Sequence, residues 1–250
     1  MYIRHEDGVE VLDLNGQLAD GSLASVRKKF AQSIQSALIH RLIAEVEDTS
    51  LYLGDWQKGE IQITGIVRIT TNRYWTEIDY SVLFPPKPGK IEPAKGTYRN
   101  IVWNAGETPG CGALLQSSSG DLIVVRSFRH AMRSWRLELP TGVRRPDESD
   151  EACAIREATE ECGVVSFTRA IRLGMVQPDT GVLRSNMPVY LLTDVVVDGA
   201  RVQRDISEST MGPIQLTWAD YRRRVVSDEI NDARLLAAIE KARAHDLLVS

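Results

Sequence analysis

The chain has 250 residues, of which 43% are hydrophobic and 26% are charged, and its formal net charge is −4 at pH 7. This length allows one or two domains that each bury a core, and the negative charge argues against general nucleic-acid binding. No apolar run is long enough to span a bilayer, and the first residues lack the basic-then-apolar order of a signal peptide. Three cysteines without paired spacing fit a reducing compartment. We therefore expect a cytoplasmic protein without a membrane or nucleic-acid partner.

The front of the chain predicts a small α+β segment. Apolar residues at helical spacing predict one long amphipathic helix over about 22–46. Residues 61–70 and 74–84 then read as two strands, and the second alternates strictly between its two faces. The proline- and lysine-rich stretch 85–96 is typical of a linker. We place a domain boundary at its end, which separates residues 1–96 from 97–250.

A buried strand with basic residues at its end is predicted next, over residues 121–130. It is followed by the stretch Trp135–Gly142, which leads into an acidic segment. Several arginines accompany this strand, and each fits either an anion-binding role or an ordinary surface charge. The arginines that the sequence leaves open in this way are Arg126, Arg133 and Arg136.

Between Gly142 and Val164, residues of fixed type follow at fixed spacings. They are Gly142, Glu148, Arg156, Glu157, Glu160, Glu161, Gly163 and Val164. The segment predicts a helix that Asp147 or Ser149 caps and that Gly163 ends. Ala154, Ile155, Ala158 and Cys162 form its apolar stripe.

Three glutamates of this helix, Glu157, Glu160 and Glu161, are spaced i, i+3, i+4 and share a neighbouring stripe. Like charges at such spacings repel by a few tenths of a kcal/mol per pair. Arg156 lies one turn before Glu160 and can pair with it. A solvated acidic face would gain nothing from this arrangement, whereas Mg²⁺ or Mn²⁺ takes oxygen ligands of this kind. The spacing therefore favours a site for a divalent cation bound to a polyphosphate.

The pattern resembles the Nudix box, G-x5-E-x7-R-E-U-x-E-E-x-G-U with U apolar, and it is complete at the fixed positions. The resemblance implies an α/β fold, namely a Nudix-type α/β/α sandwich with a mixed sheet, here preceded by the small α+β domain. It also implies hydrolysis of a nucleoside diphosphate linked to another group. By matching positions, Glu157 and Glu161 are the principal metal ligands, and Glu160 is a further ligand or holds the attacking water. Arg156 and Glu148 are structural partners within this catalytic box.

The flanking residues resemble those of ADP-ribose pyrophosphatases, so that the likeness covers about residues 98–245. In that subfamily the arginine matching Arg129 meets a substrate phosphate, and the glutamate matching Glu138 helps to hold metal or substrate. The residue matching Thr141 offers its backbone carbonyl to metal. Pro178 occupies a proline position that the subfamily shares near the substrate, and Ser227–Ile239 resembles its closing helix.

A base that accepts the proton of the attacking water often lies on a loop after the box in related enzymes. Residues 204–212 fit that loop by position. Glu208 is our first choice and Asp205 the second, although both also fit solvated loop acids. Glu208, Glu160 and Arg156 are thus the candidate catalytic residues.

These observations predict a Mg²⁺-dependent enzyme, with Mn²⁺ as a further option, that cleaves the pyrophosphate of ADP-ribose or of a related nucleoside diphosphate sugar. The alternatives are a non-catalytic nucleotide sensor, or hydrolysis of a dinucleotide or a specialised nucleotide metabolite. Relatives are commonly dimers, so we expect a homodimer. The front segment could serve that assembly or form a wall for the substrate's base. The aromatic residues suited to such a wall are Tyr74, Trp75 and Trp103.

Overall fold

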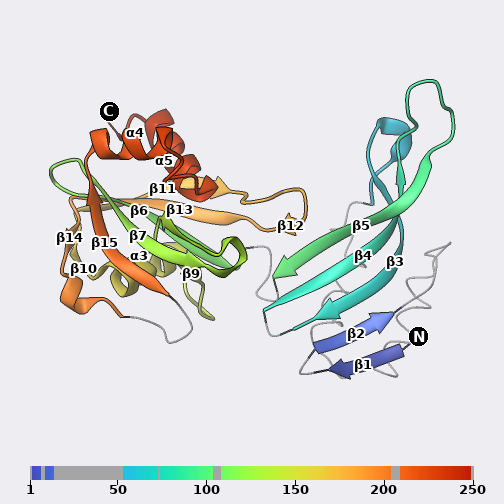
Figure 1. The fold of residues 1–250 in the computed structure, drawn as a ribbon, viewed down its shortest axis with the longest axis horizontal. Coiled ribbons are helices and arrows are strands. Elements are labelled where there is room, and N and C mark those ends of the chain that lie inside the picture. The colour runs from blue at the N-terminus through green and yellow to red at the C-terminus, as the bar shows by residue number, and fades with distance from the viewer. Residues whose placement is uncertain are drawn as a thin grey trace. The chain divides into compact units, whose positions relative to one another are not determined.

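The computed structural model divides the chain into two compact units (Figure 1). The residues that it describes are 2–6, 9–13, 53–72, 74–103, 108–203 and 209–248. The first unit comprises Met1–Asn104 with Gly181–Arg184, and the second comprises Ala105–Thr180 with Ser185–Ser250. The helix expected over about 22–46 lies outside the described residues.

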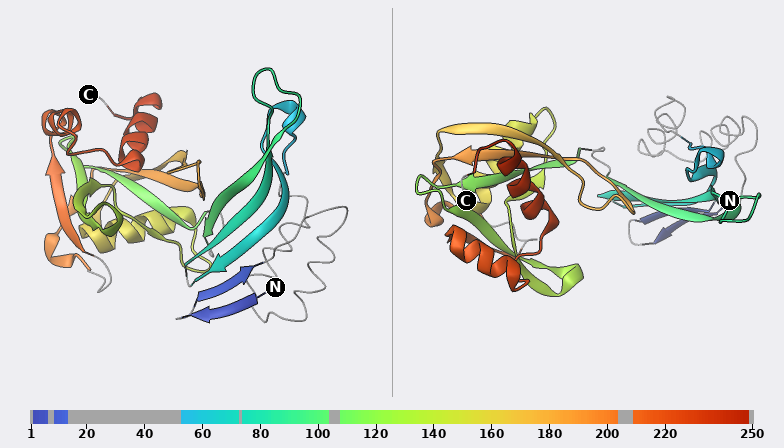
Figure 2. Two further views of the ribbon diagram at one scale, coloured as in Figure 1. Left: turned by 45° about the vertical axis from the view of Figure 1, so that its right-hand side comes forward. Right: turned by 90° about the horizontal axis from the view of Figure 1, so that it is seen from above.

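The first unit contains, in its described part, a six-stranded sheet with the order β1-β2-β3-β4-β5-β12. Its elements are β1 (Tyr2–Glu6), β2 (Val9–Asp13), β3 (Gln62–Thr71), β4 (Trp75–Phe84), β5 (Ala94–Trp103) and β12 (Leu183–Arg184), with a short 3-10 helix η1 (Trp56–Lys58) before β3. The long strands β3, β4 and β5 run antiparallel and side by side in both views of Figure 2. Strands β3 and β4 confirm the two predicted strands.

The two faces of this sheet differ as the alternation in β4 predicts. Ile78, Tyr80 and Val82 are buried and pack with Ile69 and Val102 in one apolar cluster. The intervening Asp79 lies on the other face, where Arg99 Nε donates to its Oδ1 at 2.6 Å and Arg68 Nε donates to its Oδ2 at 3.0 Å. These hydrogen bonds, above all the one from Arg99, lower the pKa of Asp79.

The edge of this sheet is formed by a segment from far along the chain. Strand β12 pairs in parallel with β5, with Leu183 opposite Ile101. The backbone N–H of Ile101 also donates to Val182 O at 2.8 Å, and the Tyr98 hydroxyl donates to Gly181 O at 2.7 Å. The first unit is therefore completed by residues that follow strand β11. The division into domains 1–96 and 97–250 stays a prediction, and its boundary falls within β5.

The second unit is built on a mixed sheet of seven strands, with the order β11-β13-β6-β7-β15 and with β8 on β7 and β9 on β6. The strands are β6 (Gly110–Gln116), β7 (Leu122–Arg129), β8 (Ser134–Glu138), β9 (Thr141–Val143), β11 (Arg169–Val176), β13 (Met187–Thr193) and β15 (Thr210–Leu216). Strands β13 and β6 are parallel, whereas the other pairs are antiparallel. A separate two-stranded sheet joins β10 (Val164–Ser166) to β14 (Val196–Val197), and two short 3-10 helices are η2 (His130–Met132) and η3 (Gly199–Arg201).

Helices cover both faces of this sheet (Figure 1). Helix α3 (Asp150–Cys162) packs on one face through Ala154 and Ala158, which share a cluster with Leu115 of β6. Helices α4 (Trp218–Val226) and α5 (Ala233–Ala244) pack on the other face, in the cluster that contains Leu114. Adjacent residues of β6 thus point to opposite helix layers. This confirms the α/β/α sandwich with a mixed sheet.

The C-terminal helix differs in position from the sequence-based expectation. Helix α5 begins at Ala233, capped by Asp232, whose side chain accepts from Leu235 N. Ser227, where we expected the helix to begin, instead ends α4, and Asp228 follows with a φ of 60° that stops the helical backbone. Among the described residues, no helix is both long and apolar enough to cross a membrane.

Candidate active site

Helix α3 carries four of the candidate residues, and local sequence sets both of its ends. The Ser149 hydroxyl accepts from Ala152 N at 3.1 Å, so Ser149 rather than Asp147 is the cap. Gly163 ends the helix with a φ of 65°, and its N–H donates to Thr159 O. A Cβ on Gly163 would lie 2.2 Å from Asp198 O, so a side chain is excluded there on two grounds.

Gly142 in β9 lies against α3 at the point where Glu157 reaches the sheet. A Cβ on Gly142 would fall 2.0 Å from both Cδ and Oε1 of Glu157. Any side chain at position 142 would therefore occupy the space that the Glu157 carboxylate fills. The spacing between this glycine and the glutamate thus fixes a buried carboxylate against the backbone of β9.

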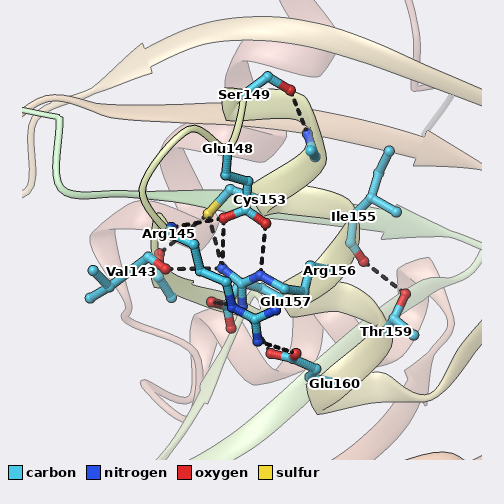
Figure 3. Close-up of polar contacts among 12 residues, drawn as sticks. Val143, Arg145, Glu148, Ser149, Cys153, Ile155, Arg156, Glu157, Thr159 and Glu160 are labelled. Atoms are coloured by element: carbon cyan, nitrogen blue, oxygen red, sulfur yellow. Dashed lines mark hydrogen bonds and ion pairs between the residues drawn. The ribbon is translucent and has the colours of Figure 1, made fainter.

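Arg156 is the centre of a hydrogen-bond network that joins the acids of the box (Figure 3). Its Nε and Nη2 donate to the two carboxylate oxygens of Glu148 at 2.8 and 3.0 Å. Its Nη1 donates to Glu157 Oε1 at 2.6 Å and to Glu160 Oε2 at 2.9 Å, and Nη2 also reaches Val143 O at 2.9 Å. The expected pairing of Arg156 with Glu160 and with Glu148 is present.

This network sets the charge states of its members. The hydrogen bond from Arg156 is the largest influence on Glu148 and lowers the pKa of that carboxyl to about 2. Conversely, the hydrogen bond to Glu148 is the main cause that raises the pKa of Arg156. Both groups are therefore charged across the whole neutral range, and the guanidinium offsets the repulsion among the neighbouring glutamates.

Two glutamates of α3 converge on adjacent residues of β9. Glu157 lies over Gly142, and Glu161 Oε2 accepts the backbone N–H of Thr141 at 3.1 Å. Glu160 lies further out, where its Oε1 also accepts from Arg145 Nη2 at 2.9 Å. The structure thus brings Glu157, Glu161 and the backbone of Thr141 together, and it places Glu160 beside them.

A second polar cluster surrounds Glu138, a carboxylate with only 2% of the residue exposed. Arg129 Nε donates to both carboxylate oxygens, at 2.8 and 2.9 Å, and Arg129 Nη2 contacts Oε2 as well. Arg234 at the start of α5 donates from Nη2 to Glu138 Oε2 at 2.7 Å and from Nη1 to Thr141 Oγ1 at 3.4 Å. The hydrogen bond with Glu138 is the largest cause that raises the pKa of Arg129.

Arg234 is a residue of the site that the sequence did not reveal. It lies 96 positions after Glu138, and only its place in the expected closing helix gave any signal. Its guanidinium is further held by Asp232 Oδ2, which accepts from Nε and Nη2 at 3.1 Å. Helix α5 is thereby linked to Glu138 and to Thr141.

The donor chemistry fits a divalent cation of the magnesium type. Within the described part of the chain, no group of three or more His, Cys, Asp or Glu side chains is arranged as a ready metal cluster. Arg156 holds the carboxylates of Glu157 and Glu160, and the Thr141 backbone N–H donates to that of Glu161. The side chains gathered at β9, those of Glu157 and Glu161, nevertheless offer carboxylate oxygens, and hard cations prefer oxygen ligands.

The remaining candidates lie elsewhere or beyond description. Pro178 is half-buried in the connection after β11, where Gln177 Nε2 donates to Asn186 Oδ1 at 2.9 Å. Glu208 and Asp205 lie outside the described residues. The end of the expected loop, residues 210–212, belongs to β15 instead, because it pairs with β7.

Comparisons with known proteins identify the kind of domain that carries these residues. Residues 106–223 match the family model of the NUDIX domain, so this part of the chain is a NUDIX domain. It is 26% identical over 156 residues to the ADP-ribose pyrophosphatase of Bacillus subtilis (strain 168), a likeness that covers 62% of this chain and 80% of that protein. The crystal structure of an ADP compounds hydrolase shares the fold with a TM-score of 0.54 at 18% identity, over 74% of this chain and 90% of that one. The chain is therefore a Nudix pyrophosphohydrolase.

Proposed function

We propose that this enzyme hydrolyses the pyrophosphate bond of ADP-ribose, or of a related nucleoside diphosphate sugar, in a Mg²⁺-dependent reaction that gives a nucleoside monophosphate and a sugar phosphate. The observation that carries this proposal is the convergence of Glu157 and Glu161 on β9, next to the cluster of Glu138 and Arg129. The similarity to an ADP-ribose pyrophosphatase supports the choice of substrate. Mn²⁺ is a second candidate ion because it accepts the same oxygen donors.

A diphosphate bridge is anionic and repels hydroxide, so its hydrolysis depends on positioning and on electrostatic stabilisation. A bound divalent cation supplies charge neutralisation and a more acidic water. The chain's own residues prepare that site. Arg156 holds the carboxylates of Glu157 and Glu160 at 2.6 and 2.9 Å, and Gly142 leaves room for the first of them.

Arg129 is proposed to meet a phosphate oxygen of the substrate. Its side chain is 44% exposed even while it is bound to Glu138, so part of the guanidinium stays accessible. Glu138 orients this guanidinium in a fixed plane, which suits the fork-like recognition of phosphate. Pro178, in the connection that follows β11, is proposed to contact the substrate.

Glu208 is proposed as the base that takes the proton from the attacking water, with Asp205 as the second candidate. The proposal rests on their position in the chain after the box. A carboxylate in this role must come within hydrogen-bond reach of the water when substrate is bound. The kinetics of variants at Glu208 and Asp205 test this proposal directly.

The assembly and the compartment are proposed on separate grounds. We propose a homodimer, as in related enzymes, which size-exclusion chromatography with light scattering would establish. We propose a cytoplasmic enzyme because the cysteines are all free and buried, which suits a reducing compartment. The cysteines concerned are Cys111, Cys153 and Cys162.

The decisive experiment is a panel of diphosphate compounds assayed with Mg²⁺ and with Mn²⁺, in which release of nucleoside monophosphate is measured. The panel contains ADP-ribose, ADP-glucose, UDP-glucose, GDP-mannose and NADH. We expect the highest kcat/KM with ADP-ribose or another nucleoside diphosphate sugar. A clear preference for NADH would instead indicate a dinucleotide hydrolase, and no turnover of any compound would contradict the proposed reaction.

Matched variants connect the activity to the box. Glu157→Gln and Glu161→Gln each remove one carboxylate charge at β9 and should abolish most turnover of the best compound. Glu151→Gln makes the same change at an exposed position in the first turn of α3 and should leave kcat/KM close to the wild-type value. Wild-type turnover in both of the first two variants would show that these glutamates do not hold the metal.

A further inference from the structure

The three arginines that the sequence left open have different environments in the β7–β8 hairpin. Arg126 pairs with Leu137 across the ladder and therefore shares the face that packs on α4 and α5, where it stacks over the Trp135 ring at 5.2 Å. Arg133 lies at the end of the hairpin, over the Phe128 ring at 5.5 Å. Neither position belongs to the face of the sheet that carries Glu138.

Arg136 lies on that face. It precedes Glu138 by two positions in β8, and successive side chains of a strand alternate, so both point to the same side. The ladder gives the same result, because Glu138 pairs with Val125, which packs in the α3 cluster. Arg136 thus shares its face with the residues of the candidate site, and Arg126 does not.

The charges of the cluster around Glu138 balance without Arg136. Arg129 and Arg234 carry two positive charges, and both are held by Glu138, with Asp232 as the second acid on Arg234. Two cations and two anions offset one another in this cluster. Arg136 is a further cation on this face of β8, and among the described residues no carboxylate lies within ion-pair distance of it. Arg136 therefore carries a positive charge that no ion pair among the described residues offsets.

Arg136 is also held in place by a neutral partner. Its Nη1 donates to Asn231 Oδ1 at 3.2 Å. The orientation of that amide follows from its other end, because Asn231 Nδ2 donates to Asp228 O at 3.2 Å. Asn231 follows Ile230, which is 1% exposed and anchors the turn between α4 and α5. This contact uses one of the five N–H donors of the guanidinium and leaves its charge intact.

We propose that Arg136 binds a phosphate oxygen of the diphosphate substrate. The positive charges of Arg129 and Arg234 are offset by Glu138 and Asp232, whereas that of Arg136 is available to the substrate. A guanidinium suits this ligand because its planar fork matches two oxygens of one phosphate group. The inference rests on the proposed function, since it takes a nucleoside diphosphate compound as the substrate. In this assignment Arg129 chiefly maintains the structure of the site through Glu138, and Arg136 attracts the negatively charged substrate.

The test compares two variants that make the same change of charge in the same hairpin. Arg136→Gln removes the cation from the face of the site, whereas Arg126→Gln removes one from the opposite face. With the best diphosphate of the panel, Arg136→Gln should raise KM by about tenfold or more with a much smaller change in kcat, which is the pattern for lost binding of a ground-state anion. Arg136→Lys should lie between, because it keeps the charge and loses the fork. Arg126→Gln should keep the wild-type KM.

Ionic strength gives an independent readout, because salt screens an exposed charge. Between low and high salt, the wild-type KM should rise more steeply than that of Arg136→Gln, while Arg126→Gln follows the wild type. A merely structural role of Arg136 would not produce this difference in slope. Thermal unfolding of each variant identifies any loss of fold, and Asn231→Ala, which frees the guanidinium without removing it, should then raise KM by a smaller factor than Arg136→Gln.

Binding of AMP and of inorganic pyrophosphate, measured by calorimetry without turnover, separates this inference from the proposed reaction. An enzyme that hydrolyses no diphosphate would contradict the proposed function, but about tenfold weaker binding of either anion by Arg136→Gln would still support the anion site. If Arg136→Gln and Arg126→Gln share the wild-type KM, salt slope and anion affinity, the inference is wrong. If the wild type binds neither anion and hydrolyses none of the compounds, both proposals fail.

Discussion

Replacing Gly142 by alanine should impair the enzyme through Glu157 without a general loss of the fold. The new Cβ would lie 2.0 Å from Glu157 Cδ and Oε1, whereas an ordinary contact begins at about 3.4 Å. The carboxylate must therefore move by about 1.4 Å, since the backbone of β9 is held in the sheet by its pairing with β6. The added methyl group thus displaces chiefly one side chain, that of Glu157.

The size of the effect follows from this displacement. Metal–ligand distances tolerate only about 0.2 Å, so Glu157 could no longer serve as a ligand from its native position. A misplacement of about 1 Å in an active site can cost on the order of 10²-fold in rate. We therefore expect kcat/KM to fall by at least about 10²-fold, which corresponds to about 2.7 kcal/mol of transition-state stabilisation.

The assay is a Mg²⁺ titration of turnover, combined with thermal unfolding, for Gly142→Ala, Glu157→Gln and Gly199→Ala. The first two should show similarly impaired Mg²⁺ dependence, because both remove the same proposed ligand by different means. Gly199→Ala is the matched control, since a Cβ there would meet only Pro213 Cδ at 3.8 Å. A folded Gly142→Ala enzyme with wild-type turnover and Mg²⁺ midpoint would refute the argument that the carboxylate must stay at β9.

Four further measurements follow from the same contacts. Arg156→Met leaves several partly buried carboxylates without their guanidinium and should lower the free energy of unfolding in urea by on the order of 3–5 kcal/mol, whereas a change within error would show the network to be unimportant. Because the pKa of Glu148 is lowered to about 2 from 4.5, its contribution to stability is complete above about pH 4.5 and is lost as the pH falls through 2; Glu148→Gln should flatten that part of a stability–pH curve. Glu208→Ala should lower kcat by a factor on the order of 10²–10⁴ if Glu208 is the base, and an unchanged kcat would remove it from the mechanism. Chelation by EDTA should abolish turnover yet shift the melting temperature little, because Arg156 already offsets the acids; a large fall in the melting temperature would contradict this.

Local sequence predicted the elements whose signals lie within a few residues. The helix over 150–162 follows from its cap at Ser149, its apolar stripe and its terminal Gly163, all of which act within one or two turns. The alternation in 74–84 predicted both the strand and its buried face. The network around Arg156 could be predicted for the same reason. Three of its partners, Cys153, Glu157 and Glu160, lie within about one turn of it on the same helix.

Contacts between distant segments could not be predicted in this way. Strand β12 is only two residues long, Leu183–Arg184, and it exists because β5 offers a free edge to pair with. Nothing in its own residues sets that register. Arg234 and Glu138 meet only because α5 packs on the sheet that carries β8. The box predicts a glycine at position 142. Only the structure shows why, because the carboxylate of Glu157 fills the space that a side chain would need.

The hydrogen bonds of Arg156 also explain how two acids of the stripe, Glu157 and Glu160, can lie close together without a metal ion. Glu157 and Glu160 would repel each other on adjacent turns, yet both accept from Arg156 Nη1, at 2.6 and 2.9 Å. A guanidinium does not lose its proton near neutral pH, so Arg156 is a permanent counter-ion for Glu157 and Glu160. A cation at the proposed site would therefore share these carboxylates with Arg156 and would not have to assemble them. The proposed site is thus prepared by the fold, and a bound ion would contribute chiefly to the chemistry.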